Sequence, residues 1–258
     1  MENSIVERLT FLTVSRTVKA SKAKKSLLVV VGSGSALAQR IVSDLGTYDL
    51  FIAFSTRGSS IQYCGKSWSS IKYDSASYES LRQIFASPSL PSRSEIDRVC
   101  LVSFTGAKDS KLFISSDGAM IQDLLNTNFT VNAYFANLMI RKYRGIPLSM
   151  VFLSSAGALS GGVGLTIYSS AKQALSGMVR SIAIEYGRLN VNANAVALGA
   201  LPFGMKESVS QVSINKILEK TSTGSLIEPD SVSNTIKFLL SNPDVNGAVV
   251  PCDGGFHG

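Results

Sequence analysis

The sequence has little histidine and little cysteine, and this scarcity excludes several kinds of active site. Its 258 residues include one histidine, His257. A histidine general base, or a metal site built from several histidines, is therefore excluded. The three cysteines, Cys64, Cys100 and Cys252, have neither zinc-knuckle spacing nor the even number of a disulfide framework. We expect no metal, three buried and reduced thiols, and a cytoplasmic location.

Long apolar runs are also missing. No stretch approaches the ~20 apolar residues that a membrane helix needs, so we expect no membrane contact. The first 26 residues contain no long apolar stretch of the kind found in a secretory signal. Hydrophobic residues nevertheless make up 45% of the chain, enough for the core of one α/β domain.

Acidic residues are few at the N-terminus, where more than half of the net positive charge lies. The formal net charge is +7, and residues 1–25 hold six basic and two acidic side chains. We interpret residues 1–25 as a solvated basic extension and residues 26–258 as the folded domain. A nucleic-acid surface and an organelle transit peptide remain alternatives for the extension. No aromatic–basic repeat accompanies the charge, so we expect no nucleic-acid partner.

What the sequence does contain is a regular alternation of apolar, strand-like runs with helical patterns. This alternation predicts a single-domain, Rossmann-like, doubly wound parallel sheet of seven strands, with helices on both faces. The expected strands are Leu27–Val31, Asp49–Phe54, Ser70–Tyr73, Arg98–Phe104, Leu148–Ser154, Val191–Val196 and Ala248–Pro251. The expected helices are Ser35–Leu45, Ser77–Phe85, Ala119–Arg144, Ile167–Gly187 and Pro229–Leu240.

A glycine turn follows the first expected strand. Its residues are Gly32, Ser33, Gly34, Ser35, Ala36 and Leu37. Glycine lets the backbone turn sharply and approach a pyrophosphate, which then accepts hydrogen bonds from the N–H groups of the next helix. The pattern departs from GxGxxG, and a tight turn without a ligand remains an alternative.

A tyrosine and a lysine share one face of an expected helix. Tyr168 and Lys172 are four residues apart, so their side chains lie on the same side. A carbonyl that accepts hydride needs a proton donor, and with histidine scarce a tyrosine suits that role. A nearby lysine cation is expected to lower the tyrosine pKa. The spacing alone is common, and chance remains its alternative explanation.

With these motifs the chain resembles a short-chain dehydrogenase/reductase, closest to the 3-oxoacyl-acyl carrier protein reductase type. The likeness covers about residues 26–255 and includes a closing Asp253-Gly254-Gly255. It implies that Ser155, thirteen residues before Tyr168, is the catalytic serine, with Ser154 as the competitor. It also implies that Asn128 holds a water that links Lys172 to solvent.

The resemblance also assigns cofactor contacts. Thr56 stands at the acidic place of NAD-binding relatives and Arg57 follows it, which favours NADPH because a guanidinium suits phosphate. The implied adenine contact is Asp74. Gly106, Gly199 and Leu201 are expected in loops beside the nicotinamide. Ala36 stands where the family has glycine, and Ser103–Gly106 keeps only the glycine of the family's Asn-Asn-Ala-Gly.

The implied reaction is NADPH-dependent reduction of a ketone, with a 3-oxoacyl thioester on acyl carrier protein as the first substrate hypothesis. Arg141, Lys142 and Arg144 are the candidate carrier-protein contacts, with an ordinary solvated helix end as the alternative. The segment Ala200–Thr223 is expected to form an apolar lid. A homotetramer or homodimer follows from the resemblance. The altered glycine loop leaves a second hypothesis, an inactive structural or regulatory subunit.

Overall fold

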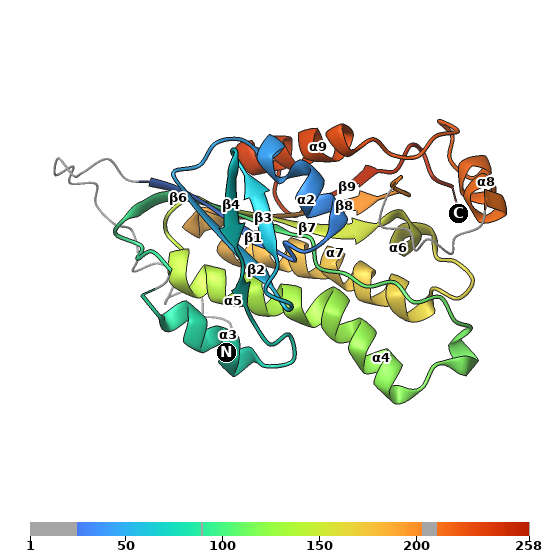
Figure 1. Ribbon diagram of the computed structural model, residues 1–258, viewed down its shortest axis with the longest axis horizontal. Coiled ribbons are helices and arrows are strands. Elements are labelled where there is room, and N and C mark those ends of the chain that lie inside the picture. Colours follow the sequence, from blue (N-terminus) through green and yellow to red (C-terminus); the bar gives the residue numbers. More distant parts are fainter. Residues whose placement is uncertain (1–24, 89, 203–210, 258) are drawn as a thin grey trace.

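The computed structural model describes residues 25–88, 90–202 and 211–257. Their core is a seven-stranded parallel sheet with strand order β5-β2-β1-β6-β7-β8-β9 (Figure 1). This confirms the predicted fold class. The strands are β1 (Lys25–Val31), β2 (Leu50–Ser55), β5 (Ile71–Lys72), β6 (Ile96–Ser103), β7 (Leu148–Ser155), β8 (Val191–Leu198) and β9 (Val249–Cys252). The predicted extension, apart from Lys25, lies outside the described residues.

Helices cover both faces of the sheet because the central strands are apolar on both sides. Leu27, Val29 and Val31 of β1 pack toward one face, and Leu28 and Val30 pack toward the other. Figure 1 shows α3, α4, α5 and α7 along the first face and α2 and α9 along the second. Their bounds are α2 (Ala36–Ile41), α3 (Tyr78–Ala86), α4 (Gly118–Leu125), α5 (Val131–Tyr143), α7 (Thr166–Tyr186) and α9 (Pro229–Ser241).

An antiparallel hairpin that the sequence analysis did not predict lies between β2 and β5. Its strands are β3 (Ser60–Tyr63) and β4 (Lys66–Ser69). The turn residues Cys64 and Gly65 both have positive φ, 49° and 74°, as a two-residue type I′ turn requires. Cys64 is exposed and Cys252 is half-buried, so the prediction of three buried thiols is confirmed only for Cys100. The buried side chains of β3 pack on the α2 face of the sheet.

The predicted helical stretch Ala119–Arg144 is confirmed, but it is not α-helical throughout. A π-helical segment, η3 (Asn126–Thr130), separates α4 from α5. Two short helices were also not predicted, α6 (Ala156–Ser160) directly after β7 and α8 (Gln211–Glu219). In the described part of the chain, no helix combines the length and hydropathy needed to cross a bilayer.

Candidate active site

Ser155 and Tyr168 meet at the carboxyl end of β7. Ser155 is the last residue of β7 and caps α6, where its hydroxyl oxygen accepts the N–H of Gly157 at 3.2 Å. Tyr168 lies in the first turn of α7. Burial raises the pKa of Tyr168, and a hydrogen bond with the side chain of Ser155 partly offsets the rise. The expected lowering of this pKa by Lys172 is not what the structure shows.

Lys172, four residues after Tyr168 on α7, is buried and hydrogen-bonds to backbone carbonyls. Its side chain is 4% exposed, and its Nζ donates to the carbonyl oxygens of Leu153, at 2.8 Å, and Thr105, at 3.0 Å. Burial lowers its pKa from 10.5 to about 8, because the charged form loses hydration. The neighbouring Ser154 donates its hydroxyl to the carbonyl of Lys172 at 3.1 Å. The hydroxyl of Ser154 therefore bonds to helix α7, whereas Ser155 contacts the side chain of Tyr168.

Asn128 lies in the π-helical segment and is fully buried. Its Nδ2 donates to the carbonyls of Ala107, at 2.8 Å, and Leu124, at 2.9 Å. Its Oδ1 accepts the N–H of Ala107 at 3.2 Å. The widened helical turn thus presents this amide to the loop after β6 and fixes that loop beside Lys172. π segments often occur at functional sites for this reason.

Gly106 lies between Asn128 and Lys172. A Cβ placed on Gly106 would lie 2.9 Å from Lys172 Nζ and 3.2 Å from Asn128 Oδ1. The loop therefore approaches both polar groups more closely than any side chain permits. This explains in physical terms why the loop Ser103–Gly106 has glycine at its last position.

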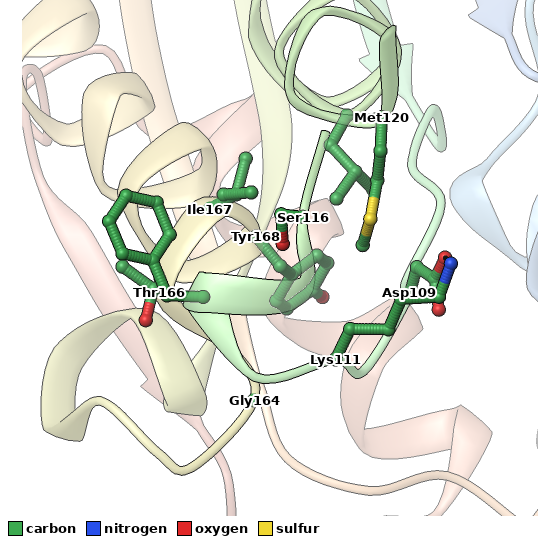
Figure 2. Close-up of a pocket in the computed structure, with 10 residues that line it drawn as sticks. Asp109, Lys111, Ser116, Met120, Gly164, Thr166, Ile167 and Tyr168 are labelled. Atoms are coloured by element: carbon green, nitrogen blue, oxygen red, sulfur yellow. Dashed lines mark ion pairs between the residues drawn. The ribbon is translucent and has the colours of Figure 1, made fainter. Parts of the chain in front are cut away.

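Tyr168 also borders a narrow crevice that is too tight to hold a water molecule. Figure 2 shows Tyr168 of α7 and Met120 of α4 extending into this space, with Lys111 and Asp109 of the loop after β6 at its edge. Phe113 also lines the pocket and is 59% exposed. The lining mixes polar and charged side chains with apolar ones, and Asp109, Lys111, Ser116 and Thr166 stand beside Phe113, Met120 and Ile167.

The glycine turn after β1 packs closely against the loop after β6, and its approach to a pyrophosphate stays a prediction. Gly32 has a φ of 75°, and a Cβ there would lie 2.9 Å from the carbonyl carbon of Phe104. Ser33 is buried, with its hydroxyl bonded to the Phe54 carbonyl at 3.1 Å and to Ser70 at 2.5 Å. Ser35 caps α2 by accepting the N–H of Ala38 at 3.1 Å. Ala36 and Leu37 begin α2, the former exposed and the latter buried.

The residues predicted to contact the adenosine half of the cofactor, and to favour NADPH over NAD, lie at the outer strands of the sheet. Thr56 and Asp74 line one open hollow of about 470 Å³, together with Lys72. Arg57 is exposed, and its N–H donates to the Ser55 hydroxyl at 3.2 Å. Asp74 accepts the N–H of Ala76 at 2.9 Å. Lys72 was not predicted, although its position one residue before the end of the expected strand Ser70–Tyr73 was a usable signal.

The loop after β8 carries the remaining predicted residues. A Cβ on Gly199 would lie 2.8 Å from the Cα of Asp253, so glycine is needed where these two loops cross. Leu201 is partly buried and packs against the α2 and α9 side of the core. Part of the predicted apolar lid, Ala200–Thr223, falls at residues 203–210, which lie outside the described residues.

Two further buried polar residues support the site and were missed by the sequence analysis. Thr105 donates its hydroxyl to Asn132 Oδ1 at 3.0 Å, and Asn132 Nδ2 donates to the carbonyl of Asn128 at 2.9 Å. The available signal was the spacing of Asn132 four residues after Asn128 on one helical face. In the described residues, no group of three histidine, cysteine or acidic side chains gathers as a metal site.

The fit to a nicotinamide dinucleotide rests on the outer hollow. The close approaches of Gly32 and Gly106 are to atoms of this chain, Phe104 and Lys172, and serve its own packing. The hollow at Thr56, Lys72 and Asp74 lies at the carboxyl ends of β2 and β5, where open α/β sheets bind their ligands. The residues present therefore fit such a cofactor.

Comparisons with known proteins agree with this architecture. A family model described as enoyl-(acyl carrier protein) reductase matches residues 61–257. The chain is 30% identical over 159 residues to carbonyl reductase family member 4 of Xenopus laevis, covering 60% of this chain and 65% of the relative. It is also 30% identical over 161 residues to 3-oxoacyl-[acyl-carrier-protein] reductase FabG of Aquifex aeolicus, covering 60% and 64%. Each match spans less than two thirds of the relative's length.

Solved structures extend the likeness of the fold. A short chain dehydrogenase from Leptospira borgpetersenii with bound NAD+ superposes with a TM-score of 0.77 at 15% identity, covering 95% of this chain and 99% of that one. A short chain dehydrogenase family protein from Francisella tularensis gives 0.76 at 17% identity, covering 90% and 98%.

Proposed function

This chain belongs to the short-chain dehydrogenase/reductase family of NAD(P)-dependent oxidoreductases, and on that premise we propose that it reduces a ketone to a secondary alcohol with NADPH. The observation that carries the proposal is the side-chain hydrogen bond between Ser155 and Tyr168 at the carboxyl end of β7, with the buried Lys172 four residues after Tyr168 on α7. NADPH, when bound, supplies the hydride. Gly32–Leu37, Arg57 and Asp74 would hold its adenosine and pyrophosphate half. Gly106, Gly199, Leu201 and Lys172 would hold its nicotinamide half.

The protein's own part is proton delivery. Ser155 hydrogen-bonds the substrate carbonyl oxygen, and Tyr168 gives its hydroxyl proton to that oxygen as negative charge develops. The raised pKa keeps Tyr168 protonated near neutral pH, as a proton donor must be. Lys172, with a pKa of about 8, then returns a proton toward Tyr168. Asn128 holds the loop after β6 in place and completes the route from Lys172 toward solvent.

Two observations bear on the substrate. Phe113, Met120 and Ile167 offer apolar contacts to a hydrocarbon chain beside Tyr168, next to the charged Asp109 and Lys111, and the curated relatives include a 3-oxoacyl-[acyl-carrier-protein] reductase. A 3-oxoacyl thioester is therefore our first substrate. The basic end of α5 does not support carrier-protein docking beside Tyr168. α5 ends at Tyr143, just before β7 begins, so Arg141 and Arg144 lie about 26 Å away, at the other edge of the sheet.

The alternative, an inactive structural or regulatory subunit, has one observation in its favour. Three backbone N–H groups of the glycine turn already donate within the chain: Gly32 and Ser33 to the Phe54 carbonyl, and Ser35 to the Gly32 carbonyl. An inactive subunit would bind neither NADPH nor NADH. Quenching of Trp68, the one tryptophan of the sequence, measures this binding directly.

The test of the proposed reaction is Tyr168→Phe, assayed by NADPH oxidation against 3-oxoacyl thioesters, quinones, sugars and simple ketones. We expect turnover of the best substrate to fall by roughly 10²–10⁴, because general acid catalysis contributes about that factor. NADPH binding should be retained. Tyr186→Phe, at the far end of the same helix, is the matched control and should keep full turnover. Undiminished turnover in Tyr168→Phe would refute the proposal.

A further inference from the structure

The open hollow at the outer edge of the sheet is separate from the pocket at Tyr168. It lies at the carboxyl ends of β2 and β5, and β5 is the outermost strand. Its lining residues are Thr56, Lys72, Tyr73, Asp74, Ser75 and Ser80. Thr56, which stands where an acid would bind ribose hydroxyls, thus shares this hollow with a lysine from the neighbouring strand.

The backbone register places Lys72 beside the turn that carries Arg57. Lys72 pairs with Ser55, and the preceding pair, Phe54 and Ile71, packs into the core on the α5 side. Because side chains alternate along a strand, Ser55 and Lys72 face the α2 side. A Cβ on Gly58 would lie 3.9 Å from Lys72 Cβ, so the stem of Lys72 lies against the turn at residues 56–58.

The charges at this place are not balanced. The ion pairs within the described part of the chain involve neither Arg57 nor Lys72. The single carboxylate that lines the hollow, Asp74, already accepts the N–H of Ala76. Two exposed cations with hydroxyls beside them are chemically suited to a phosphate monoester, which carries up to two negative charges.

We propose that Lys72 joins Arg57 in binding the 2′-phosphate of NADPH and is a determinant of cofactor specificity. This inference rests on the proposed NADPH-dependent function. Arg57 offers its planar guanidinium from the β2 turn, and Lys72 offers a point charge on a flexible stem from β5. Thr56, which lines the hollow with Lys72, is neutral and does not repel the phosphate as an acidic side chain would.

The test measures binding without catalysis. Adenosine 2′,5′-bisphosphate and 5′-AMP are titrated by calorimetry into the wild type, Lys72→Gln, Lys72→Arg and Lys66→Gln. Lys66, an exposed lysine on β4, is the charge-matched control. Loss of one charge-assisted hydrogen bond should weaken the bisphosphate by about tenfold or more and leave 5′-AMP within about twofold. Lys72→Arg should restore most of the affinity, and Lys66→Gln should match the wild type.

The outcomes separate this inference from the proposed function. If Lys72→Gln binds the bisphosphate like the wild type while Arg57→Gln is weakened, the role of Lys72 is refuted and the NADPH preference stands. If the wild type binds the bisphosphate no more tightly than 5′-AMP, the NADPH preference itself fails, and the role of Lys72 fails with it. Melting temperatures of all variants show whether each one folds.

Discussion

Two regions, both at the carboxyl ends of the parallel strands, differ in how deeply their side chains are buried. The catalytic corner, formed by Asn128, Ser155, Tyr168 and Lys172, lies beside the interior strands β6 and β7, and its lysine and asparagine are buried. The outer edge, formed by Thr56, Arg57, Lys72 and Asp74, lies at β2 and β5, where all four side chains are exposed.

The difference follows from what each region must do. Proton transfer requires fixed distances, and the catalytic corner fixes them with backbone carbonyls that hold Lys172 Nζ at 2.8 and 3.0 Å. Recognition of a phosphate needs charge more than exact geometry, and exposed cations supply it without a desolvation cost. Substitutions at the two regions should therefore differ in their effects on stability.

The largest expected effect concerns the buried lysine. Between about pH 8 and about pH 10.5, the unfolded chain keeps the proton of Lys172 while the folded chain releases it. The free energy of unfolding should therefore rise with pH across this window, by up to about 3 kcal/mol, and the cost of burying the charge is greatest below it. Urea denaturation of the wild type and Lys172→Met at several pH values measures this, since the free energy of unfolding of the wild type should rise relative to that of Lys172→Met as the pH increases. The same pH dependence of the free energy of unfolding in both proteins would contradict it.

The next largest effect on stability is expected from substitution of one of the two asparagines in the π segment. Asn128→Ala removes the bonds to both backbone groups of Ala107 and should lower the free energy of unfolding by about 2 kcal/mol. It should also slow turnover, because the loop beside Lys172 loses its support. Asn126→Ala, which removes one exposed contact with Gln122, should cost under about 0.5 kcal/mol. Equal losses in the two variants, measured by chemical denaturation, would remove the distinction.

The smallest expected effect concerns two glycines at which an added Cβ would come equally close to a neighbouring side chain. A Cβ on Gly106 lies 2.9 Å from Lys172 Nζ, and a Cβ on Gly34 lies 2.9 Å from Ser59 Oγ. Lys172 is buried and doubly bonded, whereas Ser59 is a short, partly exposed side chain that can rotate away. We expect Gly106→Ala to cost about 1–2 kcal/mol and Gly34→Ala less than about 1 kcal/mol. Thermal melts of both variants decide whether the outer edge is the more adjustable region.

Much of the sheet and the catalytic pairing was predictable because it depends on local spacing. The seven strands were recognised by apolar runs, and Tyr168 and Lys172 by four-residue spacing on one helix. The hairpin of β3 and β4 was not predictable from its turn, because Cys64-Gly65 replaces the usual Asn-Gly or Asp-Gly signal. The position of Lys72 beside the turn at Arg57 depends on pairing between strands, which no local pattern specifies.

The π segment has a consequence for how this chain tolerates insertions and deletions. Five residues, Asn126–Thr130, form a turn that holds one residue more than an α-helical turn would. Removing a single residue there would allow one regular helix from α4 into α5, and the flanking segments would keep their orientation because the widened turn itself accommodates the extra residue. A single lost codon would thus preserve helical content while removing the widened turn that presents Asn128 to Ala107. The position of Asn128 therefore depends on the number of residues in this segment as much as on their identity.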